Sequence, residues 1–186
     1  MRTPVPDNLR LQQGVGLIEV LVASLILAIG VLGFAGMQMQ AVRVGGESHA
    51  RVQATAIAQD LIERITMNDS TLVQGANGYA IALSTGDSVS VPSSLPVDCQ
   101  TGACTSAQMV TFDVGQVAYY AATLLPGGLV SGQVAATGSR NLQVFVAWGG
   151  TKPVVGSGDD ACMSDASGTP AYLPAANCVM LEATFQ

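Results

Sequence analysis

The stretch from Val15 to Met37 constrains this chain more than any other feature, because it is apolar or small at every position except Glu19. About 20 consecutive apolar residues are enough to cross the hydrocarbon core of a bilayer as a helix. This stretch is therefore a candidate membrane span. A carboxylate near the start of such a span costs about 2.5–3.5 kcal/mol to insert. That cost marks Glu19 as a candidate functional residue whose partner has to be found.

Two general interpretations account for the apolar run. In the first, the run is a signal anchor, and Glu19 lies close enough to the membrane interface for its carboxylate to stay hydrated. In the second, the run is a cleaved secretory signal with Arg2 and Arg10 in a basic leader and Gly33-Phe34-Ala35 as a small-x-small site before Gly36. Neither interpretation gives the carboxylate a chemical purpose.

The string GVGLIEVLVA, which begins at Gly14, resembles the class III signal of type IV pilins and pseudopilins. The resemblance implies that a prepilin peptidase cuts after Gly14, that Val15 becomes the N-methylated first residue, and that Glu19 is the carboxylate at mature position five. The usual first residue in this family is Phe, so Val15 departs from the commonest pattern. The opening, together with GFAGMQ from Gly33, is similar to the PilV-type minor pilins.

The resemblance also implies a function. In this family the fifth-position Glu pairs with the N-terminal amine of a neighbouring subunit, which makes Glu19 an assembly residue. Minor pilins are structural subunits that need no cofactor. They join other minor pilins and the major pilin, help to initiate the pilus, and lie near its tip, where some carry an adhesin.

Two alternatives to a pilus subunit stay open. A minor pseudopilin of a type II secretion system shares the same N-terminal signal. A signal-anchored or secreted binding domain belongs to a different class, and a mature terminus at Gly36 in place of Val15 would establish it.

Charge indicates the orientation of the chain and excludes one class of partner. The formal net charge is −6, from 7 basic and 13 acidic side chains. An acidic chain lacks the basic surface that binds nucleic acid, so no nucleic-acid partner is expected. Basic residues precede the span, which places residues 1–14 in the cytoplasm and the rest across the inner membrane. We therefore expect a precursor in the bacterial inner membrane and a mature subunit in the pilus at the cell surface.

Four cysteines follow the span: Cys99, Cys104, Cys162 and Cys178. An even number in an exported domain indicates disulfides, and three pairings are possible. Cys99–Cys104 with Cys162–Cys178 is favoured because each bond closes a short local loop. The spacings match no common zinc pattern, so no metal site is expected.

The helical pattern continues beyond the span, because apolar residues recur at steps of three and four on one face: Ala50, Ala54, Ile57, Ala58, Leu61, Ile62 and Ile65. We predict a leader at 1–14, a long helix over about 15–67 with a transmembrane half at about 15–37, and a head at 68–186. Gly45-Gly46 is the predicted place for a kink or a melted turn. An anchor followed by a separate helix is the alternative.

The rest of the chain predicts a small α+β head. Tyr79–Leu83 is a candidate short strand, and a stripe of apolar residues from Ser106 to Pro126 predicts a second helix. Strands are predicted at 129–135, 141–148 and 178–185, the last two from alternating apolar residues, with a long loop over 149–177. The expected architecture is pilin-like: a long N-terminal helix packed on a small antiparallel sheet.

No set of residues predicts catalysis. His49 is the one histidine, and no nucleophile or metal-binding motif accompanies it. Asp159, Asp160 and Asp165 cluster in the predicted loop, where oxygen ligands for calcium are conceivable. Their spacing does not match an EF-hand, so a solvated acidic loop is expected.

Overall fold

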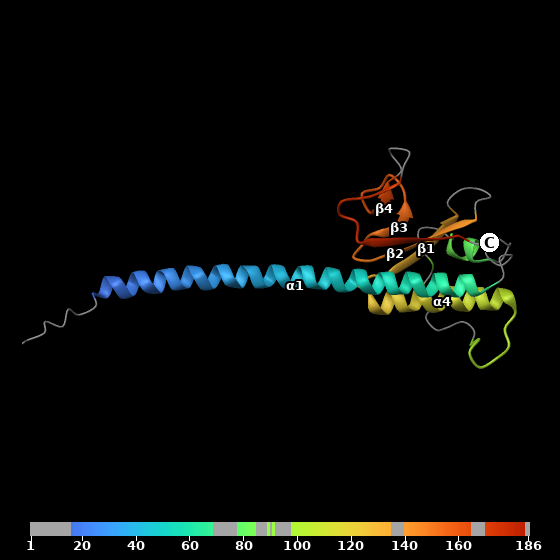
Figure 1. The fold of residues 1–186 in the computed structure, drawn as a ribbon, viewed down its shortest axis with the longest axis horizontal. Helices are drawn as coiled ribbons and strands as arrows, with labels where there is room; N and C mark the ends of the chain where they lie inside the picture. The colour runs from blue at the N-terminus through green and yellow to red at the C-terminus, as the bar shows by residue number, and fades with distance from the viewer. Residues whose placement is uncertain are drawn as a thin grey trace, which may run out of the picture. The chain divides into compact units, whose positions relative to one another are not determined.

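The structure is a computed structural model of the 186-residue chain. It describes residues 16–68, 78–84, 89, 91, 98–134, 140–164 and 170–184. The chain divides into two compact units, Met1–Gly45 and Gly46–Gln186. In the first unit the described element is the N-terminal part of helix α1, and the second unit contains a head of helices and strands (Figure 1).

Helix α1 extends over Leu17–Met67. Gly45 and Gly46 are both helical, so the melted turn predicted there is wrong. The end of the helix is where the sequence indicated it. The Asn68 backbone N–H donates to the Ile65 carbonyl at 3.2 Å, and its side-chain amide donates to the Arg64 carbonyl at 2.9 Å. Two of the carbonyl groups that a helix leaves unpaired at its end are thereby satisfied.

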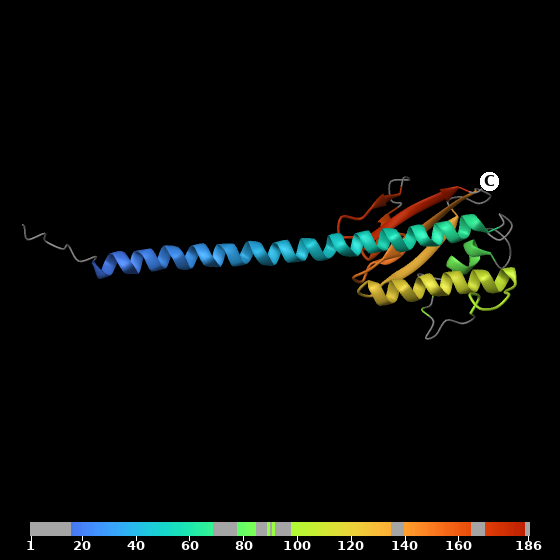
Figure 2. The same ribbon diagram turned by 60° about the horizontal axis from the view of Figure 1, so that its bottom comes forward.

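Helix α4 spans Ser106–Leu124, which confirms the second predicted helix. It begins with a capping box, in which the Thr105 hydroxyl accepts from the Gln108 backbone N–H at 3.4 Å and the Gln108 side chain accepts from the Thr105 N–H at 2.9 Å. Gly127, with φ of +66°, turns the chain after the helix. Figure 2 shows α4 beside the C-terminal part of α1 in the head.

The short segment Tyr79–Leu83 is helix α3, so the strand predicted there is wrong. Tyr79 and Leu83 are four residues apart, so a helix places both on one face, and both are fully buried. Alternation over five residues could not separate this pattern from a strand. Across from α3, a Cβ at Gly132 would lie 3.0 Å from the Leu83 side chain, so the helix packs closely on the sheet.

The main sheet is antiparallel and has the order β1-β2-β6, with β1 at Leu129–Val134, β2 at Asn141–Ala147 and β6 at Cys178–Thr184. All three were predicted. The C-terminal half of α1 buries the predicted apolar stripe in one core with the sheet and α4. Hydrophobic burial of this kind is the main force that stabilises the head.

A second sheet, with the order β3-β4-β5, occupies much of the predicted loop. Its strands are β3 (Lys152–Val155), β4 (Ala161–Ser164) and β5 (Ala171–Tyr172). The long structureless loop predicted over 149–177 is therefore wrong. These strands are four, four and two residues long, which is too short to show alternation. A small core of Phe145, Ala147, Cys162, Met163 and Cys178 supports them against the main sheet.

Candidate functional site

The N-terminal part of α1 presents an apolar surface in every direction. Large side chains from Leu17, which is 85% exposed, to Val44, which is 57% exposed, make no core in this unit. Of the described elements, α1 is long and apolar enough to span a membrane. Monomeric soluble proteins rarely expose so large an apolar surface, which indicates a binding surface for lipid or for other protein helices.

Glu19 lies in the first turn of α1. Its backbone N–H donates to the Gly16 carbonyl at 2.8 Å, which starts the helix. A carboxylate in the first turn is stabilised by the positive end of the helix dipole. No described residue forms an ion pair with Glu19. Gly14 and Val15, the residues predicted to flank the cleavage site, lie outside the described residues.

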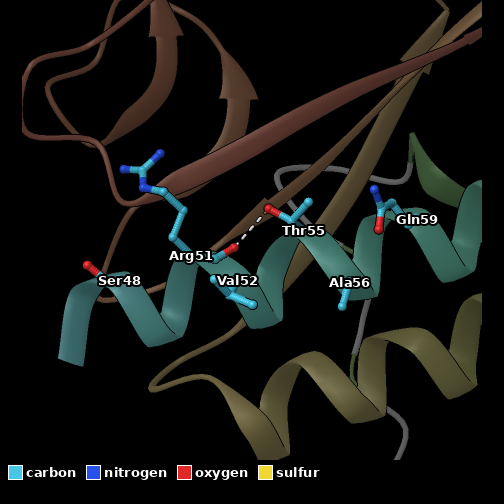
Figure 3. A pocket seen from close by; sticks show the side chains of 6 residues that line it. All are labelled: Ser48, Arg51, Val52, Thr55, Ala56 and Gln59. Atoms are coloured by element: carbon cyan, nitrogen blue, oxygen red, sulfur yellow. Dashed lines mark hydrogen bonds between the residues drawn. The ribbon is translucent and has the colours of Figure 1, made fainter. Parts of the chain in front are cut away.

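The exposed face of α1 in the head contains a shallow groove lined by Ser48, Arg51, Val52, Thr55, Ala56 and Gln59 (Figure 3). Val52 and Ala56 supply its apolar part, and the Thr55 hydroxyl donates to the Arg51 carbonyl at 2.9 Å. Figure 3 shows the Arg51 side chain extending toward the strands, away from Val52 and Ala56. Ser48 and Thr55 supply hydroxyl groups, but the lining residues include no carboxylate, histidine or cysteine that could activate them.

The Arg51 side chain links α1 to the main sheet. Its guanidinium lies 5.8 Å from the centre of the Trp148 ring, and its NH1 group donates to the Cys178 carbonyl at 3.4 Å. A weaker contact of 3.9 Å joins it to Glu47. A cation over an indole contributes about 0.5–1 kcal/mol at such partly exposed positions. Arg51 therefore acts as a structural contact of the head.

A polar network joins the C-terminal end of α1, the first residue of α3 and Asp113 inside α4. Arg64 donates from NH1 to Asp113 at 3.1 Å and from Nε to Asp60 at 3.0 Å. The Tyr79 hydroxyl donates to the other Asp113 oxygen at 2.5 Å and accepts from the Asn68 amide at 2.6 Å. Burial, followed by the bond to Asp113, raises the pKa of Tyr79 well above its usual value.

Sequence reasoning did not identify this network. One signal was present, because Asp113 comes directly before Val114 in the apolar stripe of α4 and is almost completely buried. A carboxylate at such a position needs a partner in the core. The partners Arg64 and Tyr79 come from distant parts of the chain, so no local pattern contains them.

The four cysteines form two disulfides, Cys99–Cys104 and Cys162–Cys178, which is the local pairing. The first closes a turn just before α4. The second ties β4 of the small sheet to β6 of the main sheet. Both bonds lie in the head and suit an oxidising compartment.

The remaining candidate groups form no reactive site. Asp160 pairs with Lys152 at 3.0 Å, and the hydrogen bond from Lys152 lowers the pKa of the Asp160 carboxyl. Asp165 lies outside the described residues. The described part of the chain contains no group of three metal-ligating side chains. His49 is exposed on α1.

Two family models match the sequence. One, described as type IV pilin Tt1218, matches residues 36–115, and the other, described as the prokaryotic N-terminal methylation motif, matches residues 9–35. The second match contains the Gly14–Val15 bond and Glu19. No curated protein and no solved structure matches the chain. The two matches adjoin at the C-terminal end of the predicted span and together cover residues 9–115.

Proposed function

We propose that this chain, which is a type IV prepilin, serves as a PilV-type minor pilin that helps to initiate pilus assembly. Pilins are structural subunits, and they associate with one another and with the prepilin peptidase. The precursor is an inner-membrane protein and the mature subunit enters the pilus. Its immediate partners in this proposal are other minor pilins near the tip, the major pilin, and an adhesin where one is present.

The observation that carries the proposal is the exposed apolar helix that has one carboxylate in its first turn. A helix that is apolar on all sides needs lipid or other helices around it. Glu19 without a cation among the described residues suits a partner supplied by another subunit. After removal of residues 1–14, the new amine at Val15 would be such a cation, and a charge pair inside an apolar bundle offsets part of the desolvation of both groups.

The minor role rests on the likeness of the opening sequence to PilV-type pilins. In the proposed precursor the head is exported, and the two disulfides form there. The processing steps are performed on this chain by the peptidase and its methyltransferase activity.

The first test is the mass and N-terminal sequence of the mature protein from cells with an active prepilin peptidase. We expect a chain that begins with N-methylated Val15. A start at Gly36 would contradict the proposal and favour a secreted binding domain, and an uncut chain would favour a signal anchor.

The second test compares Glu19→Gln with Glu47→Gln, an exposed carboxylate on the same helix. We expect Glu19→Gln to be processed normally but to fall at least about tenfold in sheared pili, since a buried unpaired amine costs several kcal/mol. Glu47→Gln should enter normally. Equal incorporation of both variants would remove the assembly role of Glu19.

The abundance of this chain in the fibre and the effect of its deletion distinguish the proposed role from its alternatives. A minor pilin should be a small fraction of the fibre protein, and its deletion should reduce the number of pili. Normal pili together with a defect in protein secretion would identify a type II pseudopilin.

A further inference from the structure

The proposed function does not use the outer edge of β6, which is the side of the strand that faces away from β2. Among the strands that the structure describes, β6 of the main sheet pairs with β2 on one side and with none on the other. The backbone groups of alternate residues in an antiparallel strand point to opposite sides. Hydrogen bonds from outside the sheet reach Cys178 and Met180, so the alternate residues Cys178, Met180, Glu182 and Thr184 direct their backbone groups outward. Such an edge can pair with a strand of another chain.

Side chains already occupy the first half of this edge. Arg51 donates to the Cys178 carbonyl at 3.4 Å. The Tyr172 hydroxyl accepts from the Met180 backbone N–H at 2.9 Å and lies 3.5 Å from the Met180 carbonyl, to which it can donate. One hydroxyl thus contacts both groups that a neighbouring strand would use, because a phenol is both a donor and an acceptor.

The small sheet holds Tyr172 in this position. Tyr172 belongs to β5 and is opposite Met163 of β4. The Cys162–Cys178 disulfide then ties β4 to β6. Tyr172 itself is half exposed, so burial alone does not place its ring. Register and disulfide together explain why the hydroxyl meets Met180.

We propose that Tyr172 and Arg51 close the outer edge of β6 against antiparallel pairing with β6 of a second copy of this chain. The residues along the outer edge of β6 are compatible with antiparallel pairing of two copies. A twofold axis at Leu181 would place Met180 of one copy opposite Glu182 of the other, so no like charges would stand directly opposite each other. Backbone pairing of this kind needs the Met180 groups that Tyr172 occupies. The contact keeps the head from associating through its sheet and leaves α1 as the route of association.

The inference is tested on the full mature chain in detergent by comparing Tyr172→Phe with Tyr119→Phe. The first change removes only the hydroxyl that meets Met180. Tyr119 is exposed to a similar extent on α4, and none of the described hydrogen bonds involves its hydroxyl, so it is the matched control. A photoreactive benzoylphenylalanine in place of Glu182, which is exposed on β6, reports pairing in each background.

Two results are expected together. Hydrogen exchange of the Met180 amide should become about fivefold faster in Tyr172→Phe, the factor that corresponds to one ordinary hydrogen bond. Crosslinks from position 182 to the Cys178–Met180 segment of a second copy should appear in Tyr172→Phe and increase with protein concentration.

Three outcomes would overturn the inference. Unchanged exchange at Met180 in Tyr172→Phe would show that the hydroxyl does not protect this edge. Faster exchange without crosslinks would show that the uncovered edge does not pair with a second copy. Equal crosslinking in the wild type or in Tyr119→Phe would show that the edge is open without any change at Tyr172.

Discussion

Asp113→Asn tests how strongly the polar network holds α1, α3 and α4 together. The substitution keeps the shape of the side chain and removes its charge. Asp113 is 5% exposed and accepts from both Arg64 and Tyr79. An amide retains one acceptor oxygen, so one of these two hydrogen bonds is lost and the ion pair with Arg64 disappears.

The size of the effect depends on the contacts that Arg64 retains after the substitution. Removing one partner of a fully buried ion pair costs about 3–5 kcal/mol. Arg64 retains Asp60 at 3.0 Å, and its side chain is 26% exposed, so water can solvate the freed group. The expected loss is therefore that of one hydrogen bond to a charged group, about 2 kcal/mol.

Urea unfolding in detergent, followed by tryptophan fluorescence, measures this loss. Trp148 is the one tryptophan of the chain and is buried in the head, so its emission reports unfolding of the head. For a urea m-value of about 2 kcal/mol/M the midpoint should fall by about 1 M. Asp60→Asn is the control. Its side chain is 44% exposed, and exposed pairs contribute about 0–1 kcal/mol.

Two results would refute this reasoning. A midpoint within about 0.2 M of the wild type for Asp113→Asn would show that the network contributes little to stability. Equal losses for Asp113→Asn and Asp60→Asn would show that burial of Asp113 does not strengthen its contact.

Three further predictions concern the head. Because the folded pKa of Tyr79 is raised, its stabilising contribution is complete below a pH of roughly 10 and is lost as the pH rises above that value; the urea midpoint should therefore fall more steeply above pH 10 in the wild type than in Tyr79→Phe. Replacing Cys162 and Cys178 together with Ser opens a loop with a sequence separation of 16 and should cost about 3 kcal/mol, seen as a lower urea midpoint; reducing agent should lower the midpoint of this variant less than that of the wild type, because the Cys99–Cys104 disulfide is the one that it retains. A Cβ at Gly128 would lie 2.0 Å from a carbonyl oxygen of α4, so Gly128→Ala should lower the melting temperature more than Gly127→Ala, whose cost is the left-handed backbone, about 1–2 kcal/mol; a larger loss in Gly127→Ala would contradict the steric argument.

Periodicity predicted the elements that have long, regular patterns. The apolar stripe of α1, the stripe of α4 and the strands β2 and β6 of the main sheet followed from spacing. The same reasoning failed at α3 and at the small sheet. Five residues are too few to distinguish a helix from a strand, and β3, β4 and β5 are too short, at four, four and two residues, for alternation to show. The processing residues Gly14 and Val15 and the assembly role of Glu19 stay predictions.

The sequence by itself indicated the long apolar helix and the N-terminal methylation motif, because a long apolar run and a short signal around Glu19 are local properties of the chain. The tertiary structure decided which distant groups meet. Asp113 reaches Arg64 and Tyr79, and the Tyr172 hydroxyl reaches Met180, only after three helices and two sheets have packed. The physical reason is that the spacing of apolar residues along one element can be read from residues close together in the sequence. A hydrogen bond across the core joins residues far apart in the sequence, so it depends on how whole elements pack.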